Sequence, residues 1–128
     1  NLLPTKGIHE LLAKIKVPVG VASNGPADKI RLNLTTTKLI DRFEGNIFSA
    51  YDINSWKPNP ELYLHAAKTM GFEIKDCVVI EDSPAGVQAA LSGGFDVFGF
   101  TNQANFDALQ QMNIPLFDDM ANLDLLLQ

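Results

Sequence analysis

Short apolar runs alternate with helical patterns along the whole chain, and this alternation restricts the fold more than any other feature. The expected helices cover residues 6–16, 26–38, 60–70, 84–92, 103–111 and 120–127, and the expected strands cover residues 17–22, 47–50, 77–81, 96–100 and 114–117. Right-handed crossovers join strands of this kind into a parallel sheet with helices on both faces. The predicted fold class is therefore α/β, a Rossmann-like parallel sheet within one domain of 128 residues.

The composition narrows the classes of partner. Hydrophobic residues make up 46% of the chain, which is enough for a packed core. The net charge is -5 and no basic stripe is present, so nucleic acid is not an expected partner. No apolar stretch is long enough to span a bilayer, so we expect no membrane partner. The single Cys77 cannot form a disulfide within the chain and fits a reducing, cytoplasmic compartment.

Two adjacent carboxylates follow the most apolar of the expected strands. The run Cys77–Ile80 ends at Glu81 and Asp82, and Ser83 then has the character of a helix N-cap, with Pro84 at the first helical position. Open α/β sheets bind ligands at this carboxyl end of their strands. Because two neighbouring carboxylates resist burial unless a cation joins them, Glu81 and Asp82 are candidate ligands for Mg2+.

Other polar residues are expected at the same edge of the sheet. Ser23 and Asn24 follow the first strand, and Lys57 lies in a proline-stiffened loop after the second. A hydroxyl and backbone N–H groups at a helix start suit a phosphate, and an ammonium suits its charge. Taken singly, these residues fit an ordinary turn and a solvated lysine, as adjacent acids fit a charged surface. Their convergence on one edge favours a binding site.

Three motifs, in this order, resemble those of the haloacid dehalogenase-like hydrolases. They are Val21-Ala22-Ser23-Asn24-Gly25, Trp56-Lys57-Pro58-Asn59-Pro60 and Val79-Ile80-Glu81-Asp82-Ser83-Pro84-Ala85-Gly86. The match runs over roughly residues 4–102 and is strongest to the branch that contains β-phosphoglucomutase and 6-phosphogluconate phosphatase.

The resemblance implies Mg2+-dependent hydrolysis of a small phosphorylated metabolite, such as a sugar phosphate, through an aspartyl-phosphate. In such a mechanism Ser23 and the Asn24 N–H bind the phosphoryl group and Lys57 balances its charge. Glu81 and Asp82 position Mg2+, with Asp82 the better candidate for direct ligation.

The first motif of that family, an Asp-x-Asp segment on an N-terminal strand, does not occur in this sequence. By resemblance, residues 1–128 form the C-terminal portion of a core domain without its central strand, nucleophile and cap. We expect this fragment to be inactive alone. We also expect either that a second polypeptide supplies the strand or that the strands of Ser23 and Glu81 close up into a rearranged sheet.

Three other activities stay open at this point. A phosphomutase would share the aspartyl-phosphate chemistry, and a dehalogenase would not need Mg2+. A non-catalytic phosphate- or partner-binding fragment would need no nucleophile.

Overall fold

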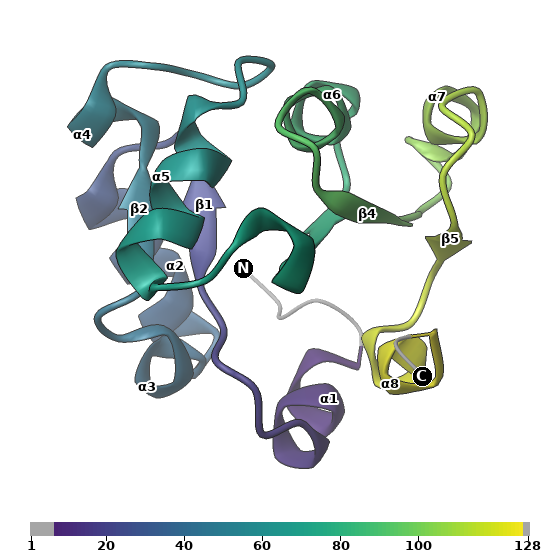
Figure 1. Cartoon of the computed structure of the whole chain (residues 1–128). Helices are drawn as coiled ribbons and strands as arrows, with labels where there is room; N and C mark the ends of the chain where they lie inside the picture. Colours follow the sequence, from purple (N-terminus) through teal and green to yellow (C-terminus); the bar gives the residue numbers. More distant parts are fainter. Residues whose placement is uncertain (1–6, 127–128) are drawn as a thin grey trace.

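The computed structural model describes residues 7–126 and has an α/β architecture with parallel strands (Figure 1). The α-helices are α1 (Ile8–Lys14), α2 (Ala27–Thr36), α3 (Ile40–Phe43), α4 (Ala50–Ile53), α5 (Glu61–Met70), α6 (Pro84–Ser92), α7 (Phe106–Gln110) and α8 (Leu123–Leu126). The strands are β1 (Val21–Ser23), β2 (Ile47–Ser49), β3 (Val78–Glu81), β4 (Asp96–Phe100) and β5 (Leu116–Phe117). Two short 3-10 helices complete the set, η1 (Ile74–Asp76) and η2 (Met120–Asn122). The predicted fold class is confirmed.

The strands form two parallel sheets, of order β1-β2 and β3-β4-β5. Ser23 stands opposite Ser49 in the first sheet, and Glu81 stands opposite Gly99 in the second. Strands β1 and β3 each lie at an edge of their sheet and do not pair with each other, so the expected rearrangement in which they close up does not occur. Helix α5 contacts β1, β2 and α6, and it therefore links the two sheets through side-chain packing (Figure 1).

Several boundaries differ from those expected. The strand predicted over residues 17–22 begins only at Val21, because its partner β2 is three residues long and Val17 is exposed. The predicted cap at Asn59 is wrong: Pro60 holds the N-cap position of α5, which no side chain caps. The helix predicted over 120–127 is η2 followed by α8, and residue 127, like residue 6 of the first predicted helix, lies outside the described range.

Two helix signals in the sequence are confirmed. The Ser83 hydroxyl accepts a hydrogen bond from the Gly86 N–H at 3.0 Å, and Pro84 follows as the first residue of α6. Helix α5 ends at Gly71, whose φ of 85° is a left-handed conformation that suits glycine. Helices α3, α4 and η1 were not predicted, because they have few residues and no clear apolar period.

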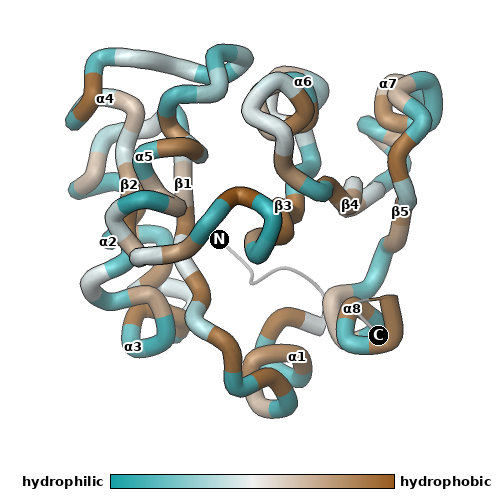
Figure 2. The backbone as a smooth tube through the Cα atoms, in the orientation of Figure 1, coloured by the Kyte–Doolittle hydropathy of each residue, from teal (hydrophilic) through white to brown (hydrophobic). Residues whose placement is uncertain are grey.

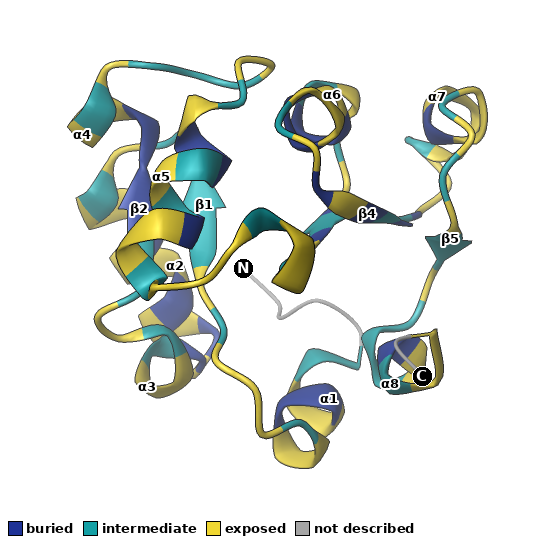
Figure 3. Cartoon of the chain, in the orientation of Figure 1, coloured by how far each residue is buried: buried dark blue, intermediate teal, exposed yellow. Residues whose placement is uncertain are grey.

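The core divides into clusters on the inner sides of the helices. Figure 2 shows that the helices carry both hydrophobic and hydrophilic residues around their circumference. Figure 3 shows that buried residues gather on β2 and on the inner sides of α5 and α6. Val87 of α6 packs with Val79 and Val97 of the second sheet, while Leu62 of α5 packs with Phe48 of β2. This packing fixes α5 and α6 beside the carboxyl ends of β1 and β3.

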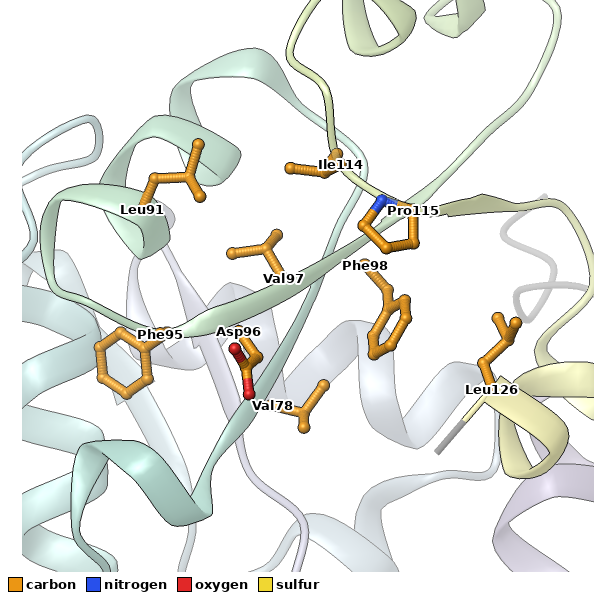
Figure 4. A pocket seen from close by; sticks show the side chains of 9 residues that line it. All are labelled: Val78, Leu91, Phe95, Asp96, Val97, Phe98, Ile114, Pro115 and Leu126. Carbon is orange, nitrogen blue, oxygen red and sulfur yellow. The ribbon is translucent and has the colours of Figure 1, made fainter. Parts of the chain in front are cut away.

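A hollow of about 430 Å³ lies at the opposite, amino ends of β3, β4 and β5 (Figure 4). Its lining is apolar except for one carboxylate, and consists of Val78, Leu91, Phe95, Asp96, Val97, Phe98, Ile114, Pro115 and Leu126. The hollow is thus remote from the strand ends that carry the candidate site. Between residues 7 and 126, none of the helices has the length and apolar character needed to cross a bilayer.

Candidate active site

Lys57 connects the carboxyl ends of the two sheets. Its Nζ donates to the backbone carbonyl of Ala22 at 3.0 Å and to Oε2 of Glu81 at 2.5 Å. The Lys57 and Glu81 side chains are only 10% and 7% exposed, so the ion pair is shielded from water. The residues predicted from β1, the Lys57 loop and β3 therefore do meet at one edge of the structure.

The Glu81 carboxylate is saturated with hydrogen bonds. Its Oε1 accepts from the Asp82 N–H at 3.1 Å and from the Ser83 N–H and hydroxyl, both at 3.4 Å. Its Oε2 accepts from Lys57 and from the hydroxyl of Tyr63. Burial opposes the charge, but the Lys57 ammonium and these hydrogen bonds outweigh it and lower the pKa of Glu81.

Gly86, in the first turn of α6, leaves the space that Glu81 occupies. A Cβ atom at this position would overlap the Glu81 carboxyl group. The glycine therefore allows α6 to bring its N-terminal backbone close to the negative charge, an arrangement that the helix dipole favours.

Asp82 has the opposite environment to its neighbour. Its side chain is exposed and forms no ion pair with another residue of the range 7–126. Its carboxyl group still loses part of its hydration, and this effect, together with the charge of Glu81, raises the pKa of Asp82. The adjacent pair is thus divided, with Glu81 turned inward to Lys57 and Asp82 directed to solvent.

The chemistry of these donors fits a hard divalent cation at Asp82 better than at Glu81. Asp82 offers exposed carboxylate oxygens, the ligand type that Mg2+ prefers, while both Glu81 oxygens already accept hydrogen bonds. Among the described residues, no group of three or more His, Cys, Asp or Glu side chains could enclose a metal ion. Further ligands to a metal at Asp82 would have to come from elsewhere, including water and substrate.

The loop after β1 is held by its own polar side chains. The Ser23 hydroxyl oxygen accepts from the Gly25 N–H at 3.0 Å, so its proton remains available for an anion. The Asn24 side chain accepts from the Lys57 N–H at 2.9 Å and donates to the Lys57 carbonyl at 3.5 Å. Asn24 therefore holds the backbone of Lys57, a contact that was not predicted from the sequence.

Three further polar residues at this edge were missed from the sequence. Ser49 is 1% exposed and donates to the Gly25 carbonyl at 2.6 Å, while Tyr63 reaches Glu81 from α5. Asn105 donates to the carbonyls of Asp82 at 2.8 Å and Phe100 at 3.0 Å. A serine that ends an apolar strand and a tyrosine on a buried helix face were the available signals, since buried hydroxyls need partners.

Asn105→Ala is expected to lower the free energy of unfolding by about 1–2 kcal/mol, because it leaves the Asp82 and Phe100 carbonyls without their amide donor. Urea unfolding followed by circular dichroism measures this loss. The matched control is Asn59→Ala, since the exposed Asn59 side chain forms no hydrogen bond within residues 7–126 and should change stability by less than about 0.5 kcal/mol. Equal losses in the two variants would contradict the role of Asn105.

Comparisons with known proteins agree with this geometry. A family model described as a haloacid dehalogenase-like hydrolase matches residues 1–94. The 6-phosphogluconate phosphatase of Escherichia coli K12 is 33% identical over 118 residues, which cover 92% of this chain and 53% of that protein. The chain spans about half the length of the curated relatives that it matches.

Solved structures show the same arrangement of elements. A haloacid dehalogenase-like protein of unknown function from Agrobacterium tumefaciens superposes with a TM-score of 0.91 at 27% identity, over 98% of this chain and 60% of that one. A Thermotoga maritima protein provisionally described as a β-phosphoglucomutase superposes with a TM-score of 0.85 at 25% identity, over 97% of this chain and 60% of that one.

Proposed function

Because the chain belongs to the haloacid dehalogenase-like hydrolases, in the branch of β-phosphoglucomutase and 6-phosphogluconate phosphatase, we propose that it carries the phosphate- and metal-binding half of a phosphatase active site. The reaction is the hydrolysis of a small phosphorylated metabolite. One observation supports this proposal above the others: Lys57 joins the end of β1, next to Ser23, to the end of β3, next to Asp82. A cation, a hydroxyl-bearing residue and an exposed carboxylate therefore lie at the same edge of the structure.

Phosphoryl transfer depends mainly on positioning the reacting groups and on neutralising their charge, and the described residues have separate roles in it. Ser23 donates its free proton to a phosphoryl oxygen, and the backbone N–H of Asn24 assists. Lys57 uses two of its three N–H donors within the protein, so the third can reach the phosphate or the attacking carboxylate. Glu81 holds Lys57 in place.

We assign Asp82 to direct contact with Mg2+. Glu81 helps to position the metal without contacting it directly. The metal, when bound, would neutralise charge on the transferring phosphoryl group. The backbone of Asp82 is already fixed by Asn105. This contact holds the backbone from which the exposed carboxylate projects at the end of β3.

The nucleophile is proposed to come from outside the described range, as an aspartate on a further strand between β1 and β3. These two strands are sheet edges without each other as partners (Figure 1). Buried backbone groups left without a hydrogen bond cost about 1–3 kcal/mol each, so such edges favour an added strand. A longer form of this chain or a second polypeptide can supply it, and residues 1–128 alone would then form an aspartyl-phosphate at no measurable rate. A cytoplasmic location belongs to the same proposal.

The test is the release of inorganic phosphate from para-nitrophenyl phosphate by the full-length protein. We expect turnover with Mg2+, a loss of at least about hundredfold after chelation, and recovery when Mg2+ is added back. Halide release from a 2-haloacid without metal would instead identify a dehalogenase. Conversion of a sugar 1-phosphate without free phosphate would identify a mutase, and phosphate binding without any turnover would favour a binding module.

A further inference from the structure

Tyr63 contacts both members of the buried ion pair. Its hydroxyl donates to Oε2 of Glu81, the same oxygen that accepts from Lys57. Its ring lies beneath the ammonium, with Nζ of Lys57 4.9 Å from the ring centroid, within the range of a cation–π interaction. Tyr63 is 9% exposed and lies on α5, the helix that joins the two sheets.

These contacts restrict where the Lys57 ammonium can lie. The ring blocks movement on one side, and the carbonyl of Ala22 and the carboxylate of Glu81 take two of its donors. The Tyr63 hydroxyl also donates to Oε2, so Glu81 depends less on Lys57 for its hydrogen bonds.

We propose that Tyr63 is a positioning residue, which holds the Lys57 ammonium at the phosphate site by fixing Glu81 through its hydroxyl and by presenting its ring face to the ammonium. The inference rests on the proposed function for its substrate, a phosphate monoester. The phenol itself is directed at Glu81 and away from solvent, so Tyr63 acts through Lys57 and not on the reacting atoms.

The kinetic test uses two variants of the full-length protein. Tyr63→Phe removes the hydroxyl and keeps the ring, and we expect kcat for para-nitrophenyl phosphate to fall by about tenfold. Tyr63→Leu removes both contacts, and we expect a fall of about hundredfold. The KM should change less than about threefold in Tyr63→Phe, whose ring still faces the ammonium, and should rise by about tenfold in Tyr63→Leu, which also loses the ring.

The matched control is Phe95→Leu. Phe95 is 5% exposed and packs edge-to-face on the Tyr63 ring, with centroids 6.0 Å apart, but it is absent from the hydrogen bonds of Lys57 and Glu81. Its truncation loosens the same core without altering the ion pair. We expect a lower melting temperature with kcat per folded molecule within twofold of the wild type.

A nuclear magnetic resonance experiment tests the same inference without turnover. With 15N-labelled lysine, the Lys57 ammonium protons should resonate upfield because they lie over the Tyr63 ring face, and they should shift when inorganic phosphate is added. Tyr63→Leu should abolish the upfield position and weaken phosphate binding by about tenfold or more. Tyr63→Phe is the conservative variant. It keeps the ring, so the Lys57 protons should keep their upfield position.

The two readouts separate the failures. Absence of turnover in the wild type would reject the proposed phosphatase, while the Lys57 signal would still decide the role of Tyr63. The inference is overturned if Tyr63→Leu leaves the Lys57 signal and phosphate affinity unchanged. It is equally overturned if both Tyr63 variants keep kcat within twofold of the wild type or lose no more than Phe95→Leu.

Discussion

Asp82→Ala in the proposed complete enzyme is expected to lower the Mg2+-dependent release of phosphate by at least about 1,000-fold. The reason is the division of the carboxylate pair: both Glu81 oxygens are committed to protein donors, and Asp82 keeps its carboxylate exposed at the strand end. Removing Asp82 removes the oxygen ligand that Glu81 cannot replace. Initial rates with para-nitrophenyl phosphate at saturating Mg2+ measure the loss.

The control for Asp82→Ala is Asp52→Ala. Asp52 is another exposed carboxylate that follows a strand, and it lies in α4 beyond β2. Its removal changes the net charge by the same amount, so we expect the rate to stay within about twofold of the wild type. Equal rates for Asp82→Ala and the wild type would contradict the assignment of the metal to Asp82.

Stability gives an independent readout for Asp82. Because the pKa of this carboxyl is raised in the fold, its ionised form is unfavourable there, and the penalty is fully present above the folded pKa. Metal-free Asp82→Asn should therefore melt at or above the wild-type temperature at neutral pH. The difference should disappear as the pH falls below the ordinary carboxyl range, where both folded and unfolded Asp82 are protonated.

Addition of Mg2+ should reverse that order. A cation that binds only the folded protein raises the melting temperature in proportion to its affinity and concentration. We expect this increase in the wild type and its absence in Asp82→Asn. A Mg2+-induced increase of equal size in both proteins would place the metal elsewhere.

The sequence alone was sufficient to predict those elements whose boundaries depend on a characteristic residue type or on a clear apolar pattern. Asp96–Phe100 is strand β4 with the boundaries expected, and Ser83 with Pro84 begins α6 as predicted. These features depend on local backbone chemistry, which neighbouring residues determine. The convergence of Ser23 and Lys57 with Glu81 could be predicted for a similar reason, since the order of parallel strands fixes where their ends lie.

The roles within the site depended on contacts that no local pattern contains. The sequence assigned Glu81 and Asp82 to a metal, with Asp82 the better candidate for direct ligation. It did not predict that Glu81 pairs with Lys57, which lies 24 residues earlier. Tyr63 and Asn105 acquire their roles only through helix packing and loop closure, at sequence separations of 18 and 23 residues from their partners.

Gly86→Ala is expected to lower the free energy of unfolding by about 2–4 kcal/mol, the reverse of the gain of about 1 kcal/mol that this change brings at an unconstrained helix position. The new Cβ would overlap the Glu81 carboxyl group. If this group moved away, the Lys57 side chain, which is only 10% exposed, would be left without its ion-pair partner. Urea unfolding measures the loss. In a Glu81→Ala background the carboxyl is gone, so the same Gly86→Ala change should cost less than about 1 kcal/mol. An equal cost in both backgrounds would show that the glycine is required for some other reason than the space it leaves for Glu81.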